Sequence, residues 1–335
     1  MNILVTGGFG SVGLFTIQEL LKKDCNVRVM ELKTAANEKI YKKFKSDIEV
    51  IWGDITRKED VERAVENQDA VIHLAYIIPP LSEEKPDLAW EVNIEGTRNL
   101  LNILRTFSKK IRIIFASSVS VFGNTKNLKP PRTTLDPVIP TDNYSHHKVA
   151  CEQLIKISGL DWVILRLGAV LSVSLCELDP LLFRVPLDTR IELIHAHDAG
   201  IAFANAVLDK NISKKILLIG GGPSCQMYQR EFVDKVLSFI GIGMLPDESF
   251  SSEPYYLDWM DTTESQNLLK FQNKNLDDFL EDIKKHLGFR RNFIKIVKPF
   301  VRYWLLSKSP YLKKNNSGKN NGNARVNSRV VTGTG

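Results

Sequence analysis

The sequence is poor in cysteine and has no long apolar run. Its 335 residues include four cysteines, and no two of them have C-x-x-C spacing. A disulfide framework and a cysteine-based zinc site are therefore not expected. No run of about 18 apolar residues is present, which argues against a membrane-spanning helix. Because a strand pattern begins at once, we expect no signal or transit segment and a cytoplasmic protein.

Acidic residues are missing from the last part of the chain. Residues 289–335 hold 11 of the 45 Lys and Arg and none of the 39 Asp and Glu. Residues 1–288 therefore carry 34 basic against 39 acidic side chains, a net charge of −5. A mildly acidic body predicts no nucleic-acid partner. The basic character belongs to the C-terminal segment.

Glycines follow directly after the first apolar run, at G-x-x-G-x-x-G spacing. Residues 1–6 read as a strand, and helical spacing begins after the third glycine of the motif. Glycines in this context let the backbone approach a pyrophosphate closely, and the helix N-terminus attracts the anion. The motif predicts a dinucleotide-binding turn that consists of Gly7, Gly10, Ser11, Val12 and Gly13.

Strand patterns alternate with helical patterns along the first half of the chain. Strands are predicted at 26–31, 48–52, 70–74 and 111–115, and helices at 35–44, 58–65 and 87–107. This alternation indicates an α/β fold with a Rossmann-like, doubly wound parallel sheet. Ligands bind beyond the carboxyl ends of such strands, and Asp54, Ala75 and Tyr76 fall there.

Glu31 ends the second predicted strand, 18 residues beyond Gly13. A carboxylate near this spacing accepts hydrogen bonds from the adenosine ribose and repels a 2′-phosphate. Glu31 therefore favours NAD over NADP. Lys33, two residues later, argues against this preference because a lysine can attract a 2′-phosphate. The alternative explanation is that Lys33 is simply an exposed lysine in a loop.

Three side chains form a candidate proton-transfer group. Tyr144 and Lys148 lie four residues apart on a predicted helix and so share one face. A free tyrosine has a pKa of about 10, and a nearby ammonium group stabilises the phenolate. Ser118, at the end of the fifth predicted strand, can hydrogen-bond the same substrate oxygen. Taken alone, a Tyr–Lys pair at this spacing is typical of a solvated helix face, but its place after the glycine motif favours catalysis.

Several stretches together resemble the extended short-chain dehydrogenase/reductases, in particular the NAD-dependent epimerase/dehydratase branch. The resemblance covers residues 1–288. The matching stretches are VTGGFGSVG (5–13), GDI (53–55), HLAY (73–76), VNIEGTRNLL (92–101), ASSVSVFG (116–123), YSHHK (144–148), LRLGAV (165–170), ELIHAHDAGIAFANAV (192–207) and IGGGPS (219–224).

The resemblance implies NAD as cofactor and a sugar or nucleotide-sugar as substrate. It implies Ser118, Tyr144 and Lys148 as the catalytic set, with Ser118 and Tyr144 touching substrate and Tyr144 and Lys148 touching cofactor. It places further cofactor contacts at Asp54, Ile55, Leu74, Ala75, Tyr76 and Asn93. Phe122 and Leu167 depart from the family, which commonly has tyrosine and proline there. A reductase of a non-sugar alcohol or ketone, a non-catalytic NAD-binding regulator and a tethered interaction protein stay open as alternatives. A homodimer is implied by analogy.

We expect a Rossmann domain at 1–165, a substrate lobe at 166–288 with a late strand near 216–219 returning to the sheet, and a basic segment at 289–335. Arg184 and Arg190 are candidate anion-binding residues, with surface salt bridges as the alternative explanation. Residues 179–190 are compact, which argues against a full nucleotide diphosphate as substrate.

Two remaining features concern metals and membranes. No metal is expected, because His195 and His197 lack a third ligand. His195 is expected near the cleft and His197 at a helix start, with Asp198 in the first turn.

Within 290–314, basic residues and aromatic residues fall on opposite helix faces. This pattern indicates either a helix in the membrane interface or one docked on the substrate lobe with its charges solvated. From residue 313 onward the composition predicts disorder.

Overall fold

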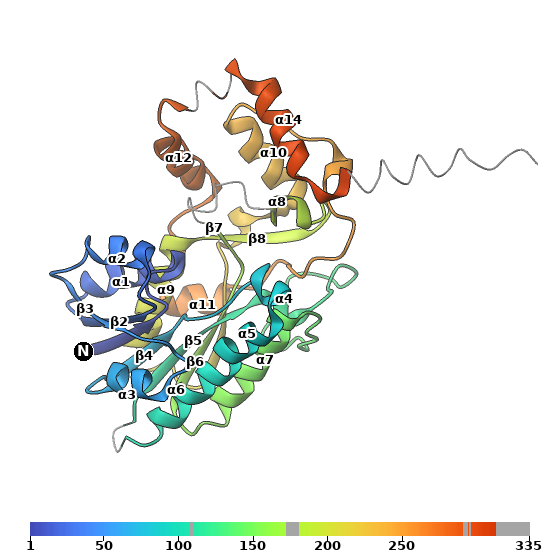
Figure 1. Ribbon diagram of the computed structural model, residues 1–335. Helices are drawn as coiled ribbons and strands as arrows, with labels where there is room; N and C mark the ends of the chain where they lie inside the picture. Colours follow the sequence, from blue (N-terminus) through green and yellow to red (C-terminus); the bar gives the residue numbers. More distant parts are fainter. Residues whose placement is uncertain (108–109, 172–180, 291–293, 295, 313–335) are drawn as a thin grey trace, which may run out of the picture.

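Alternating apolar residues place the central strands between two layers of helices. The computed structural model describes residues 1–107, 110–171, 181–290, 294 and 296–312. A seven-stranded parallel sheet forms its body (Figure 1). Its strands lie in the order β3 (Ile48–Trp52), β2 (Asn26–Glu31), β1 (Asn2–Thr6), β4 (Ala70–His73), β5 (Arg112–Ser118), β6 (Asp161–Leu167) and β9 (Lys215–Ile219).

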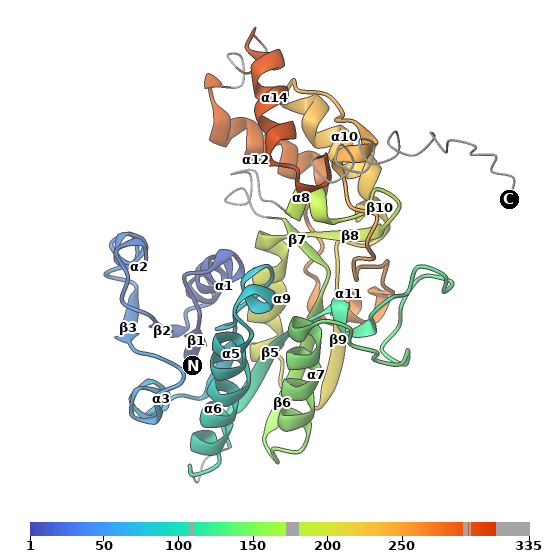
Figure 2. The same cartoon turned by 45° about the vertical axis from the view of Figure 1, so that its right-hand side comes forward.

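The side chains of β1 show which helices cover each face of the sheet. Ile3 and Val5 belong to the apolar cluster under α1 (Ser11–Leu21) and α9 (Ala196–Leu208). Leu4 points to the opposite cluster, because successive side chains on a strand alternate. That second cluster lies under α3 (Lys58–Val65), α6 (Gly96–Leu104) and α7 (Asn143–Lys156). Figure 2 shows α6 and α7 running side by side along this face.

A smaller mixed sheet and its helices form a C-terminal lobe beyond one end of the strands (Figure 1). The strands are β10 (Gln226–Tyr228), β8 (Arg190–His195) and β7 (Ala169–Leu171). Around them lie α8 (Leu181–Arg184), α10 (Gln229–Phe239), α12 (Leu276–Leu287) and α14 (Lys298–Lys308), whereas α11 (Thr263–Leu269) packs beside β9. The remaining helices and turns are α2 (Ala35–Tyr41), α4 (Leu81–Glu84), α5 (Pro86–Trp90), η1 (Glu91–Glu95), η2 (Val119–Phe122), η4 (Pro223–Cys225) and η5 (Asp247–Ser249).

The chain passes between sheet and lobe more than once. The predicted boundary at residue 165 falls inside β6, and the predicted late strand is β9, which pairs with β6. Helix α9, placed within the lobe from sequence, packs instead on the sheet through residues such as Phe203. Within the described ranges, no helix combines the length and apolarity needed to cross a bilayer. The predicted disorder from residue 313 lies outside the described residues.

Candidate active site

The glycine turn after β1 is closed tightly against the loop that follows β4. Gly7 has φ +69°, and a Cβ on it would lie 2.6 Å from the backbone nitrogen of Ala75. A Cβ on Gly13 would lie 2.5 Å from the carbonyl oxygen of Gly8. Gly10 is the N-cap of α1 and has no side chain to cap the first-turn amides, which include those of Val12 and Gly13. This narrow turn before a helix N-terminus fits the pyrophosphate of a dinucleotide.

The carboxylate of Glu31 lies beside the glycine turn. It accepts a 3.3 Å hydrogen bond from the Phe9 backbone and a 3.2 Å hydrogen bond from the Leu32 backbone. Burial raises the pKa of Glu31, and these two N–H groups act against the increase. Lys33 points elsewhere, toward the exposed Glu38 at 3.7 Å. The structure therefore puts the acid, and not the lysine, next to the turn.

The position of Glu31 beside the glycine turn predicts that the protein prefers NAD to NADP. We expect NAD to bind at least about tenfold more tightly than NADP, which corresponds to about 1.4 kcal/mol. Glu31→Ser should narrow this difference because the carboxylate no longer repels a 2′-phosphate. Isothermal titration calorimetry with both nucleotides measures the ratio, and Lys33→Ser is the matched control that should leave it unchanged. NADP as the tighter ligand of the unmodified protein would contradict this assignment.

The loops after β3 and β4 hold the other predicted cofactor residues. Asp54 accepts hydrogen bonds from the backbone and hydroxyl of Thr56, both at 2.9 Å, and so shapes the turn after β3. Ile55 is buried against α6, where a Cβ on Gly96 would meet it at 2.7 Å. The amide of Ala75 donates to the Thr6 hydroxyl at 3.3 Å. These loops lie beside Gly7 at the same edge of the sheet.

Asn93 fixes the end of the loop that contains the partly buried Leu74, Ala75 and Tyr76. Its side-chain oxygen accepts from the Ile77 amide at 2.7 Å, and its nitrogen donates to the Ile77 carbonyl at 2.9 Å. The Asn93 side chain is fully buried in η1. Asn93 therefore acts on the loop backbone in this structure.

Ser118, Tyr144 and Lys148 come together where β5 ends and α7 begins. The Ser118 side chain lies close enough to the Tyr144 phenol to lower its pKa. Lys148 is 3% exposed, and its Nζ donates to the Ala116 carbonyl at 2.7 Å. The same Nζ lies 3.2 Å from the centre of the Tyr76 ring and 5.5 Å from that of Tyr144. Tyr76 thus packs among the candidate catalytic groups.

The pKa values of Tyr144 and Lys148 differ from those expected from the sequence. Burial raises the pKa of Tyr144 above its ordinary value, while the Ser118 side chain acts in the opposite direction. Burial also lowers the pKa of Lys148 from 10.5 to about 7. The expectation that Lys148 lowers the pKa of Tyr144 is therefore wrong, because burial has the larger effect and the Lys148 ammonium group faces Tyr76 and the Ala116 carbonyl.

The lowered pKa of Lys148 predicts a pH-dependent stability. Between about pH 7 and pH 10 the unfolded chain holds the lysine proton that the folded chain releases, so this group's contribution to stability increases with pH. Below about pH 7 the folded chain bears the full cost of a buried ammonium group. Lys148→Met removes that cost, and we expect its Tm at pH 6 to exceed the wild-type value by about 2 °C or more.

This Tm difference should shrink as the pH rises toward about 10. Scanning calorimetry of both proteins across this range measures it, with the exposed Lys210→Met as a control that should show no pH-dependent difference. A Lys148→Met difference that stays constant with pH would contradict the buried, titrating lysine.

The start of α7 is anchored by Glu83, a residue that the sequence did not single out. The carboxylate of Glu83 accepts from the backbone amides of Asn143 and Tyr144, both at 3.1 Å. An acid at a helix N-terminus satisfies free amides and complements the helix dipole. Asp142 adds a capping box with Ser145. Glu83 is 61 residues from Tyr144, so no local pattern could have identified it.

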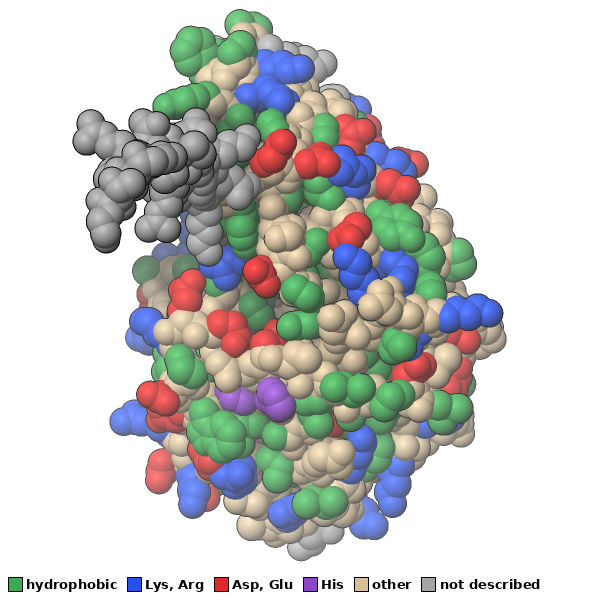
Figure 3. All heavy atoms as spheres, turned by 90° about the vertical axis from the view of Figure 1, so that its right-hand side faces the viewer, with side chains coloured by type: hydrophobic (Ala, Val, Ile, Leu, Met, Phe, Trp, Pro, Cys, Tyr) green, Lys and Arg blue, Asp and Glu red, His purple; other side chains and the backbone are tan. Residues whose placement is uncertain are grey.

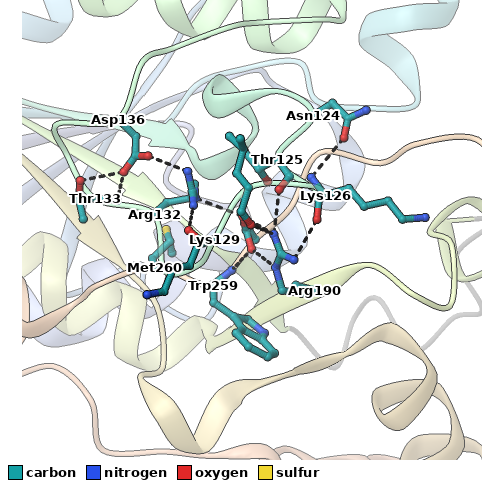
Figure 4. A network of polar contacts seen from close by, with 12 residues as sticks. Asn124, Thr125, Lys126, Lys129, Arg132, Thr133, Asp136, Arg190, Trp259 and Met260 are labelled. Carbon is teal, nitrogen blue, oxygen red and sulfur yellow. Dashed lines mark hydrogen bonds and ion pairs between the residues drawn. The ribbon is translucent and has the colours of Figure 1, made fainter.

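The two candidate anion-binding arginines lie in different settings. Arg190 contacts Asp258 at 2.6 Å and donates to the carbonyls of Thr125, Lys126 and Leu128. Figure 4 shows its guanidinium enclosed by this network, which also contains Arg132. Arg190 therefore fits the structural explanation and has no nitrogen left for a ligand. The Arg184 side chain is 38% exposed and lies 3.7 Å from Glu84 in α4.

His197 and Asp198 lie in the first turn of α9, as expected from the sequence. His195 is 5% exposed and caps α9 by accepting from the His197 amide at 3.1 Å. His195 also contacts Asp282 at 3.1 Å. Among the described residues, no group of three or more His, Cys, Asp or Glu side chains has an arrangement that could hold a metal ion.

Comparisons with known proteins agree with this fold. The chain is 31% identical over 184 residues to a D-erythronate dehydrogenase of Haemophilus influenzae, a match that covers 51% of this chain and 55% of that protein. It is 29% identical over 185 residues to a UDP-glucose 4-epimerase of Lactobacillus helveticus, covering 52% and 53%. The chain thus matches about half the length of these curated relatives.

Two solved structures share the fold over nearly their whole length. A UDP-glucose 4-epimerase of Thermus thermophilus in complex with NAD superposes with a TM-score of 0.70 at 21% identity, covering 86% of this chain and 99% of that one. A dTDP-glucose 4,6-dehydratase of Streptomyces venezuelae with bound NAD gives 0.74 at 21% identity, covering 88% and 98%.

The family model that matches is the one described as the NAD dependent epimerase/dehydratase family, and the match spans residues 3–179. That range includes the glycine turn, Glu31, and the site at the end of β5. It covers more than half of the chain. The chain therefore belongs to the NAD dependent epimerase/dehydratase family.

Proposed function

We propose that this protein is an epimerase or dehydratase that acts on a sugar or nucleotide-sugar by transient oxidation, with Tyr144 as the base. The observation that carries the proposal is the meeting of Ser118, at the end of β5, with Tyr144, at the start of α7, and Lys148 one helical turn further on. This group lies at the same sheet edge as the glycine turn, since β5 and β1 both flank β4. Proton transfer beside a hydride carrier is the chemistry that such an arrangement serves.

Each side chain has a role that follows from its contacts. Ser118 hydrogen-bonds and orients the reacting substrate oxygen, while Tyr144 exchanges a proton with it. The glycine turn and Glu31 would hold NAD, which would supply hydride transfer at the carbon that bears this oxygen. Burial raises the pKa of Tyr144, which favours the protonated phenol. Lys148 lies one helical turn from Tyr144, where we propose that it contacts the cofactor.

Arg184 is the substrate-contacting residue that we propose from the C-terminal lobe. It is partly exposed and lies opposite α4, whose Glu83 anchors the start of α7. Arg190, by contrast, is occupied by Asp258 and three carbonyls. Arg184, paired at 3.7 Å with the exposed Glu84, is therefore the arginine that we propose to bind an acidic group of the substrate.

A dehydrogenase of the same fold is the second candidate. It is favoured by the 31% identity to a protein named D-erythronate dehydrogenase. In that reaction the same three residues would act, but the reducing equivalents would leave on the cofactor. Net formation of NADH separates a dehydrogenase from an epimerase, which regenerates NAD in every turnover.

The proposal is tested by offering the purified protein catalytic amounts of NAD and a panel of substrates. Suitable substrates are UDP-glucose, UDP-galactose, UDP-glucuronic acid, dTDP-glucose and D-erythronate. Proton NMR follows conversion of the substrate, and absorbance at 340 nm follows formation of NADH. We expect at least one sugar to be converted without net absorbance change. Net NADH formation with D-erythronate and no sugar conversion would favour the dehydrogenase, and no NAD binding at all would overturn both.

Self-association is a separate proposal. By analogy with the family that the sequence resembles, we propose that the chain forms a homodimer. Sedimentation velocity of the full chain at several concentrations measures its state directly.

A further inference from the structure

Helix α14 turns an aromatic face toward solvent. Phe300, Tyr303 and Trp304 are 77%, 78% and 47% exposed, and Ser307 continues the stripe at helical spacing. Ile296, one turn earlier, is 78% exposed. Amphipathic helices on globular proteins normally bury such a stripe against the core. We use the term aromatic face for Phe300, Tyr303 and Trp304.

The opposite side of α14 holds the helix in this orientation. Leu305 is 1% exposed and packs with Val233, Leu237 and other residues of the lobe. The Arg302 guanidinium donates to the carbonyls of Ile242, Gly243 and Met244 at 2.8–3.0 Å. The sequence-based expectation for a docked helix was that its charges are solvated, but Arg302 faces the lobe, where it meets the carbonyls of the turn that follows α10. The contacts of Leu305 and Arg302 therefore hold the opposite side of α14 against the lobe, and the aromatic face points to solvent.

Basic side chains lie beside the aromatic face and in the segment around it. The Lys308 Nζ lies 5.6 Å from the centre of the Trp304 ring, whereas the exposed Lys298 lies on the same side of the helix as Arg302, with its Nζ near Gly243. The segment 289–335 contains 11 Lys and Arg and no acid, although the rest of the chain is mildly acidic. At the top of Figure 3, hydrophobic and basic side chains lie next to one another at the end formed by the C-terminal lobe.

We propose that the aromatic face of α14 binds the surface of an anionic lipid membrane. Tryptophan and tyrosine rings suit the headgroup level because one edge of the ring is apolar and the other polar. Basic side chains beside them are attracted to anionic lipid, and two such signals together give stable attachment. Figures 1 and 2 both show α14 on the outer side of the lobe, away from the sheet. The protein would therefore attach by this end and leave the glycine turn in solution.

Co-sedimentation of the full chain with vesicles tests this proposal. The vesicles are pure phosphatidylcholine or a mixture of phosphatidylcholine with phosphatidylserine, each at low and high salt. We expect binding to the phosphatidylserine vesicles at low salt, weaker binding at high salt, and little binding to pure phosphatidylcholine. Phe300→Ser/Trp304→Ser should weaken binding by about tenfold or more, because the apolar contact is lost.

Leu135→Ser/Ile157→Ser is the matched control, since both side chains are exposed elsewhere on the body, at 94% and 74%. It should bind vesicles like the wild type. Thermal melting checks that each variant is folded, and Tyr303→Ser serves as a single-site variant that is expected to weaken binding even if the double variant fails to fold.

Three results would overturn the proposal. The wild-type chain could remain in the supernatant with phosphatidylserine vesicles at low salt. The folded Phe300→Ser/Trp304→Ser variant could bind as tightly as the wild type. Sedimentation velocity could show a dimer that this variant dissociates while vesicle binding is absent, which would assign the face to a second copy of the chain.

Discussion

Tyr144→Phe is expected to lower turnover by about a hundredfold or more while leaving NAD affinity nearly unchanged. The change removes only the phenolic oxygen, which lies beside Ser118 and is the proposed proton-transfer atom. The ring remains to pack against Tyr76, whose centre lies 5.9 Å away. Steady-state kinetics on whichever substrate is converted, together with calorimetry of NAD binding, separates the two effects.

Tyr303→Phe is the control for this substitution, because its side chain is exposed on α14, outside the proposed active site, and should keep full activity. Lys148→Met should damage both turnover and NAD affinity, as expected for a residue that also contacts the cofactor. If Tyr144→Phe retained more than half of the activity, the assignment of the base would be wrong.

Gly7→Ala is expected to weaken NAD binding by about tenfold or more, equivalent to about 1.4 kcal/mol. Two features of Gly7 combine to produce this loss. Its φ of +69° disfavours any residue with a Cβ, and the new methyl group would lie 2.6 Å from the backbone nitrogen of Ala75. Since the obstacle is backbone, the glycine turn or the loop after β4 must shift.

Gly159→Ala provides a closely matched control. Gly159 has a similar φ of +75°, but a Cβ there would meet no atom within 4 Å. We expect both variants to lose some stability from the strained backbone, while only Gly7→Ala loses NAD affinity. Calorimetric titration of both proteins decides this, and a Gly7→Ala protein that binds NAD like the wild type would refute the role of the turn.

The sheet could be predicted from sequence because its signals are local. The predicted strands 26–31 and 48–52 match β2 and β3 in their limits, and each alternates toward two apolar clusters. The glycine turn and Glu31 were also predicted within a single βαβ unit, where spacing along the chain determines proximity. The β5–α7 junction could be predicted because Ser118 ends a strand and Tyr144 begins a helix.

What the sequence could not predict depends on residues far apart in the chain. Arg190 is occupied by Asp258, 68 residues away, and by carbonyls of the loop at 125–128. Glu83 reaches the start of α7 from a separate helix. The helical wheel identified the two faces of α14, but which face turns outward depends on the carbonyls that Arg302 meets. No periodicity encodes such partners, because they are determined by tertiary packing.

The central claim, that a substrate carbon gives its hydride to NAD beside Tyr144, can be tested by following deuterium. The substrate converted in the panel is prepared with deuterium on the carbon that changes, and the product and cofactor are analysed by mass spectrometry. We predict that a sugar epimerised by this protein keeps its deuterium at that carbon, since the hydride leaves and returns within one active site. Loss of the deuterium to solvent water would contradict hydride transfer and overturn the account.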